Sequence, residues 1–174
     1  MPFALRPGPA PAVTALVRGE VDFDLHPFSP DDVGDGVDLA ELLGVEPERV
    51  LETVVIEAGG RLVACILPAG WDLDDQAVAE ALGAASVRPA LEAMAERATG
   101  HPAEAVSPVG HRRRLPVLVD RAVTALQLSA PGVTVFVGSG QPGLEVEVAL
   151  RDLMAVTRAT EASLTGEGPG DSEV

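Results

Sequence analysis

The chain has 174 residues and a mass of 17.9 kDa, which is the size of one domain with its own core. Its hydrophobic content of 47% excludes a disordered chain, and its net charge of −15 disfavours a general nucleic-acid coat protein. All 12 basic residues are Arg, and Lys, Tyr and Asn are absent. Schiff-base and Walker-A lysines, catalytic tyrosines and N-glycosylation sites are therefore excluded.

The first half of the chain predicts short helices, one half-buried strand and one hairpin. We predict helices over residues 11–18 and 37–43, a helical turn at 46–48, a polar loop over 31–35, and strands over 21–26, 50–58 and 61–67. Gly19 and Gly44 are typical helix stops. The hairpin prediction rests on Gly59-Gly60, a two-residue turn signal between two β-rich runs.

The second half predicts a similar mixture of elements. We predict helices from an N-cap at Asp72 to Gly83, over 89–97 and over 151–158, strands over 115–120, 133–137 and 144–148, and a loop over 99–114. Leu91 and Met94 have the spacing of inward-facing residues in the second of these helices. Strands joined by hairpins favour a mixed sheet, so the fold class is α/β or α+β rather than a doubly wound parallel sheet.

The two ends differ in composition from the body of the chain. Residues 1–11 carry four prolines, and residues 165–174 are Gly-rich and acidic, so we expect flexible tails flanking one domain over 12–164. Cys65 lies in an apolar run, which predicts a buried thiol without a disulfide. The sequence shows no secretory signal and no apolar run long enough for a membrane span, which predicts a cytoplasmic protein.

Two loops are candidates for chemistry. One is Ser107-Pro108-Val109-Gly110 with the basic run that follows, and the other is residues 138–143. The second loop spells GxGxxG, but the alternating run 144–148 predicts a strand after it, whereas a dinucleotide-binding fingerprint requires a helix. The loop is therefore either a tight hairpin or a turn whose backbone N–H groups bind an oxyanion or carboxylate.

The order of these segments resembles the YbaK family of free-standing editing domains, which is related to the insertion domain of bacterial prolyl-tRNA synthetase. The resemblance covers about residues 12–162. The segments that carry it are the strand ending at His26, Val50-x-x-Thr53-Val54, Leu82-Gly83-Ala84, Thr99-Gly100, Ser107-Pro108-Val109-Gly110, Leu115-Pro116 to Asp120, Gly138-Ser139-Gly140, Gly143-Leu144-Glu145-Val146-Glu147 and Asp152-Leu153.

The resemblance implies a compact α/β domain with a mixed, barrel-like β-sheet surrounded by helices. It implies hydrolysis of the ester of mischarged aminoacyl-tRNA, often a proline tRNA, with no metal or organic cofactor and with prolyl-tRNA synthetase as an associated protein. It implies neither DNA nor membrane as a partner. The substrate-binding residues that it implies are His26, Phe28, Thr53, Glu104, Ser107, Pro108, Gly110, Asp120, Ser139 and Gly140. Arg112, Arg113 and Arg114 match a basic segment that would contact tRNA phosphate.

The sequence departs from the family at two positions. Glu52 stands where the family has a lysine, and Glu104 stands where it has a glycine. Replacing the lysine by Glu52 changes the interaction with a substrate phosphate or oxyanion from attraction to repulsion. At 4 Å and an effective dielectric constant of 20, each of these two interactions amounts to about 4 kcal/mol.

Three hypotheses for Glu52 follow, besides an exposed strand residue without a role. In the first, Glu52 holds the substrate α-ammonium or acts as general base for water. In the second, the domain has lost hydrolysis and only binds tRNA, an aminoacyl group or a protein. In the third, Glu52 and Glu104 bind a metal together with His101 or His111. Two other candidates also have a structural alternative, because His26 could be a core histidine and Asp120 could cap the segment at Arg121.

Overall fold

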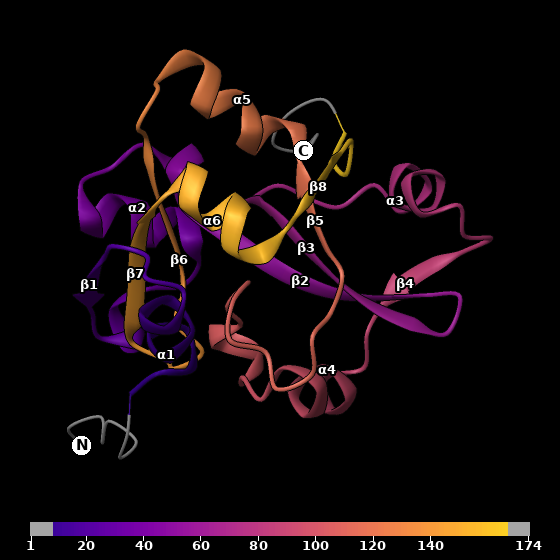
Figure 1. The fold of residues 1–174 in the computed structure, drawn as a ribbon, viewed down its shortest axis with the longest axis horizontal. Coiled ribbons are helices and arrows are strands. Elements are labelled where there is room, and N and C mark those ends of the chain that lie inside the picture. Colours follow the sequence, from indigo (N-terminus) through magenta and orange to yellow (C-terminus); the bar gives the residue numbers. More distant parts are fainter. Residues whose placement is uncertain (1–8, 167–174) are drawn as a thin grey trace.

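The computed structural model describes residues 9–166 (Figure 1). The helices are α1 (Pro11–Arg18), α2 (Gly36–Leu43), α3 (Asp75–Leu82), α4 (Glu92–Thr99), α5 (Arg121–Ser129) and α6 (Leu150–Thr157), with single 3-10 turns at η1 (Pro30–Asp32), η2 (Pro47–Arg49) and η3 (Ala103–Ala105). The strands are β1 (Phe23–Pro27), β2 (Leu51–Ala58), β3 (Arg61–Pro68), β4 (Val87–Pro89), β5 (Val117–Asp120), β6 (Thr134–Gly138), β7 (Leu144–Ala149) and β8 (Thr160–Ala162).

The strands form two sheets. A five-stranded sheet has the order β4-β2-β3-β5-β8, with β3–β5 and β5–β8 parallel and the other pairs antiparallel. A three-stranded antiparallel sheet has the order β1-β7-β6. One isolated bridge, Val50 to Phe136, connects them. The predicted mixed α/β fold is confirmed, but within residues 9–166 the strands form two open sheets and no closed barrel.

The alternating sequence of β7 gives the three-stranded sheet two different faces. Val146 and Val148 are fully buried against α1 and α6, which lie in front of β6 and β7 in Figure 1. The opposite face carries Glu145 and Glu147, because successive strand residues point to opposite sides. This polar face is covered as well, since Phe136 on the same face packs against α2.

The five-stranded sheet has a separate apolar face under α3. Ile56, Val63 and Cys65 pack there against Val78 of α3. Cys65 is fully buried, as predicted, and burial raises the pKa of its thiol to about 12. A thiol that stays protonated at neutral pH is a poor nucleophile, so Cys65 is a core residue.

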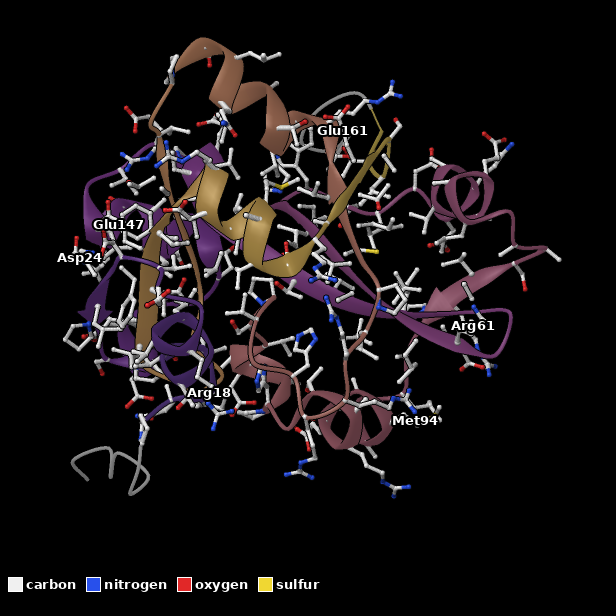
Figure 2. All side chains as sticks on the ribbon, viewed as in Figure 1. Arg18, Asp24, Arg61, Met94, Glu147 and Glu161 are labelled. Atoms are coloured by element: carbon white, nitrogen blue, oxygen red, sulfur yellow. The ribbon has the colours of Figure 1, made fainter. Side chains whose placement is uncertain are left out.

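The helix predicted over 89–97 begins three residues later than expected. Residues 87–89 form the edge strand β4 on β2, and the N–H of Ala90 bonds the Val55 carbonyl. α4 starts only at Glu92, so Leu91 and Met94 are 66% and 39% exposed rather than inward-facing. Figure 2 shows Met94 at the outer edge of the molecule.

The predicted N-cap of α3 is also wrong by two residues. Asp74, not Asp72, accepts hydrogen bonds from the N–H groups of Gln76 and Ala77. The stop at Gly83 is confirmed, because Gly83 adopts the left-handed conformation at the end of the helix.

Two elements near the C-terminal end have no counterpart in the sequence prediction, namely α5 and β8. Both depend on Asp120, whose carboxylate accepts bonds from the N–H groups of Ala122, Leu164 and Thr165. Thr165 is therefore tied to the domain, and Pro11 already belongs to α1. The predictions for residues 1–8 and 167–174 lie outside the described residues.

None of the helices in residues 9–166 combines the length and the apolar character that a membrane crossing requires.

Candidate functional site

A cavity of about 490 Å³ lies between the first residues of β2, the start of α2, η3 and the loop after β6. We call it the acidic cavity, because four carboxylate residues line it: Asp35, Glu52, Glu104 and Glu145. Among the described residues no Arg or His lines this cavity. A cavity with this lining favours ligands that carry a positive charge or hydrogen-bond donors.

Four of the residues predicted from sequence meet in this cavity, namely Phe28, Glu52, Thr53 and Glu104. Burial raises the pKa of Glu52, and the nearby carboxylates of Asp35 and Asp72 raise it further. A carboxylate with a raised pKa is a stronger base than a solvated one. The chain approaches Glu52 closely at Gly36, where a Cβ would lie 3.6 Å from the Glu52 Oε1 and 2.5 Å from the Ala69 Cβ.

Glu145 also lines the cavity, although the sequence pattern around it does not predict it as a site residue. It lies on β7, opposite Gly138 on β6 and opposite His26 on β1. Burial raises its pKa to about 8. No hydrogen bond or salt bridge joins its carboxyl group to another residue within 9–166.

Glu147, two residues along the same face of β7, has the opposite environment. Its carboxylate accepts hydrogen bonds from Thr134 and His26 and lies 3.8 Å from the Arg49 guanidinium. The Thr134 hydrogen bond, followed by His26 and Arg49, lowers the pKa of Glu147. His26 is thus bonded to Glu147 at 2.9 Å and packs edge-on against Phe136, and it does not line the acidic cavity.

The two serines predicted to bind substrate are fully buried and bond within their own loops. Ser107 Oγ accepts a hydrogen bond from the Val109 N–H. Ser139 Oγ accepts one from the Gln141 N–H and donates one to the Gln141 carbonyl. Neither serine lines the acidic cavity, so both hydroxyl groups shape the loops that surround it.

His101 holds the loop between α4 and β5 together. Its Nδ1 accepts from the Ser107 N–H at 3.2 Å, and its Nε2 is 3.1 Å from the Gly110 carbonyl oxygen, to which it donates. Burial, with a smaller contribution from the adjacent His111, lowers the pKa of His101 to about 4. The imidazole is therefore neutral at pH 7 and joins two points of the loop.

Two of the predicted glycines are required for close backbone packing. Gly110 and Gly140 both have positive φ, at 76° and 85°. A Cβ on Gly110 would lie 2.5 Å from the Pro11 carbonyl oxygen, and one on Gly140 would lie 3.0 Å from the His101 ring. The Gly140 N–H bonds the Ala105 carbonyl. The absence of a side chain at these glycines lets the two loops and the start of α1 pack closely against one another.

A second cavity of about 720 Å³ lies on the other side of the same loop, against α1 and α6. We call it the loop groove; Pro108, Gly110, His111 and Arg114 line it. Arg112 and Arg113 donate their backbone N–H groups to α4, to the carbonyls of Thr99 and Ala98. The side chains of all three arginines are exposed, which leaves them accessible to a polyanion.

The remaining predictions concern Asp120 and a metal. Asp120 is 3% exposed and is occupied by the N–H groups of Ala122, Leu164 and Thr165, which is the structural alternative for this residue. His111 lines the loop groove and the ring of His101 packs against that of His111, whereas Glu52 and Glu104 line the acidic cavity. Within residues 9–166, no three His, Cys, Asp or Glu side chains are grouped so that they could hold a metal ion.

Comparison with known proteins identifies relatives of this chain. The sequence profile of a family described as "Aminoacyl-tRNA editing domain" matches residues 31–156. Proline--tRNA ligases of Citrifermentans bemidjiense and of Geobacter sp. strain M21 are each 28% identical over 89 residues, or 51% of this chain. That segment is only 16% of the length of either ligase.

Solved structures share the fold over nearly the whole chain. One, described as a proposed trans-editing enzyme for prolyl-tRNA synthetase, has a TM-score of 0.79 at 22% identity and covers 94% of this chain and 100% of its own. Another, a hypothetical protein, has a TM-score of 0.76 at 23% identity and covers 90% and 99%. At these identities the likeness is one of fold.

Proposed function

Because this chain belongs to the aminoacyl-tRNA editing domain family, we propose that it hydrolyses the ester of mischarged, proline-type aminoacyl-tRNA in trans. Two comparisons support the proline type. The related segments lie in proline--tRNA ligases, and a structure of the same fold is described as a proposed trans-editing enzyme for prolyl-tRNA synthetase.

The observation that carries the proposal is that Glu52 and Glu104 line one cavity with Phe28 and Thr53. The aminoacyl group of a charged tRNA has a free α-ammonium, and its ester carbonyl is uncharged. An acidic cavity attracts that ammonium. Since the chain has no lysine, the site differs from the family pattern in charge, and Glu52 takes the central role.

We assign the general base to Glu52. Its carboxylate accepts a proton from a water molecule while the water oxygen attacks the ester carbonyl carbon. The tetrahedral intermediate then collapses, the bond to the ribose oxygen breaks, and the proton passes to that oxygen. The products are a free amino acid and an uncharged tRNA, and the raised pKa of Glu52 suits it to accept the proton.

The tRNA backbone requires a different surface, because the ionised carboxylates of the acidic cavity repel phosphates. The exposed side chains of Arg112, Arg113 and Arg114 are the surface that we assign to it. Guanidinium groups bind phosphate oxygens in a bidentate manner. They lie on the loop that also supplies η3 to the acidic cavity.

The test is a deacylation assay with alanyl- and cysteinyl-tRNA of the proline type. The wild type should release the amino acid faster than the uncatalysed reaction, and Glu52→Gln should lower kcat about 100-fold or more, because an amide accepts no proton. Glu41→Gln on the exposed side of α2 is the matched control and should leave the rate unchanged.

Two results would contradict the proposal. A wild type no faster than background removes the hydrolase function for these substrates and leaves a binding domain. An active Glu52→Gln variant with the wild-type rate removes Glu52 from the mechanism.

A further inference from the structure

We propose that Glu145 acts in the acidic cavity as a hydrogen-bond donor to the ester carbonyl oxygen of the bound substrate, and so is a second catalytic residue. The inference rests on the proposed function of this cavity. It assigns to Glu145 the neutral carboxylic acid form, in contrast to the ionised Glu52 that accepts a proton.

The position of Glu145 is fixed by the sheet. It stands in the middle strand of the three-stranded sheet, between Gly138 and His26 in register, and lines the acidic cavity next to Gly138 and Gly143. Gly138 has no side chain, and the Val106 carbonyl oxygen lies 2.6 Å from where its Cβ would be, so the backbone after η3 borders the cavity at this position. A carboxyl group held by a central strand is well positioned for a substrate.

The groups that face Glu145 explain why it is neutral. The titratable residues of the surrounding elements are His26 on β1, Glu147 on β7, Glu52 on β2, Glu104 in η3 and Asp35 before α2. His26 is bonded to Glu147 instead, and Arg49 is also directed to Glu147. The titratable residues that line the cavity with Glu145 are therefore all carboxylates, and Glu145 has no hydrogen-bond or ion-pair partner within the described residues.

Glu145 is half-buried, and a carboxylate that is partly removed from water without a cation or hydrogen-bond donor is unfavourable, so the group takes up a proton. The pKa of Glu145, raised by burial to about 8, agrees with this assignment. At pH 7 the carboxyl group has an O–H that can donate. This O–H has no acceptor among the described residues, and the ester carbonyl oxygen of the substrate supplies one.

The chemical consequence is stabilisation of the oxyanion. When water attacks, negative charge develops on the carbonyl oxygen, and a donor already in place stabilises that charge more than it stabilises the ester. The Gly-rich loop does not supply all such donors, because the N–H groups of Gly140 and Gln141 already bond Ala105 and Ser139. Glu145 itself returns to its starting state, since it donates a hydrogen bond and transfers no proton.

The kinetic test compares Glu145→Gln and Glu145→Leu with the wild type. Gln keeps an N–H donor that does not titrate, so its kcat should stay within about tenfold of the wild type and show no decrease as the pH passes 8. Leu has a similar size without a donor, so its kcat should fall about 100-fold. In the wild type, kcat should decrease above pH 8 after subtraction of the uncatalysed reaction, because Glu145 ionises. A Leu variant with the wild-type kcat, or a Gln variant that loses activity above pH 8 like the wild type, overturns the inference.

A binding measurement separates this inference from the hydrolase function. The probe is 3′-alanylamido-3′-deoxyadenosine, which has the carbonyl oxygen but an amide in place of the ester. Its ammonium titrates in every variant, so only the difference between wild type and Glu145→Gln reports on Glu145. The dissociation constant should rise more steeply above pH 8 for the wild type. If wild type and variant bind the probe with identical pH profiles, Glu145 is no donor, whether or not the protein hydrolyses tRNA esters; if the profiles differ but no hydrolysis occurs, only the hydrolase function fails.

Discussion

At the scale of single residues, two acids of one strand acquire opposite properties. Glu145 and Glu147 occupy the same face of β7, yet burial raises the pKa of Glu145 while Thr134, His26 and Arg49 lower that of Glu147. The alternation of β7 predicts that both point to the same side. It cannot predict that His26, 121 positions away from Glu147, pairs with that acid and leaves the other without a cation.

The buried His101 makes stability depend on pH. The unfolded chain binds a proton on this histidine below pH 6.5, whereas the folded chain does so only below about pH 4. The contribution of His101 is therefore fully present above pH 6.5 and is lost as the pH falls toward 4.

We expect His101→Ala to lower the free energy of unfolding by about 3 kcal/mol at pH 7, because it leaves the Ser107 N–H and the Gly110 carbonyl without partners and opens a small cavity. The loss should shrink as the pH is lowered from 6.5 to 4, since only the wild type bears the cost of protonating this ring. Urea unfolding at a series of pH values measures both effects. A constant difference across this range would mean that His101 is not buried neutral.

At the scale of elements, single carboxylates decide where helices begin. Asp120 caps α5 and also binds the segment after β8 through Leu164 and Thr165, while Asp74 caps α3 from an exposed position. Both aspartates come just before a helix in sequence. Because both cap a helix but only Asp120 is buried, alanine substitutions at the two positions can be compared directly.

Asp120→Ala should lower the free energy of unfolding by about 3 kcal/mol, because several N–H groups lose their acceptor, including the buried Leu164 N–H. Asp74→Ala removes an exposed cap and should cost about 1 kcal/mol. Thermal or urea unfolding measures the two variants side by side. Equal losses would show that the bonds from Asp120 to residues 164 and 165 contribute nothing.

The elements that the sequence predicted correctly are those with local signals. The hairpin of β2 and β3 follows from Gly59-Gly60, and the end of α1 follows from the helix stop at Gly19. The errors occur where distant contacts decide. Pro89 is predicted to begin a helix but belongs to β4, which pairs with β2, and β8 is a strand that pairs with β5.

The candidate site shows the same division. Phe28, Glu52, Thr53 and Glu104 could be placed in one pocket by resemblance to a family. The internal bonding of Ser107 and Ser139, by contrast, depends on hydroxyl orientation within folded loops, which composition and spacing do not determine.

At the scale of the whole molecule, the charge of −15 opposes the approach of tRNA. The tRNA binding that we propose then depends on the local group of Arg112, Arg113 and Arg114, whose side chains are exposed. The number of these arginines also limits how steeply the affinity for tRNA can fall with salt concentration, because each phosphate contact releases about one counterion.

We expect tRNA binding to weaken with salt with a log–log slope no steeper than about −3. Reversing all three charges, as R112E, R113E and R114E together, should remove measurable binding at low salt. Filter binding or fluorescence anisotropy at several salt concentrations measures the slope, and reversal of Arg88 on β4, already paired with Glu57, serves as the control. A triple variant that binds as the wild type does would place the tRNA on another surface.

The absence of any Arg or His from the lining of the acidic cavity, among the described residues, makes it a charge filter for the proposed reaction. An aminoacyl ester of a ribose brings only its ammonium into the cavity. An aminoacyl adenylate carries a phosphate directly beside the same carbonyl, and that phosphate would be repelled by the ionised carboxylates of the cavity. For the proposed reaction, we therefore expect the cavity to favour an amino acid already transferred to tRNA over one still activated on AMP, through the sign of a single neighbouring charge.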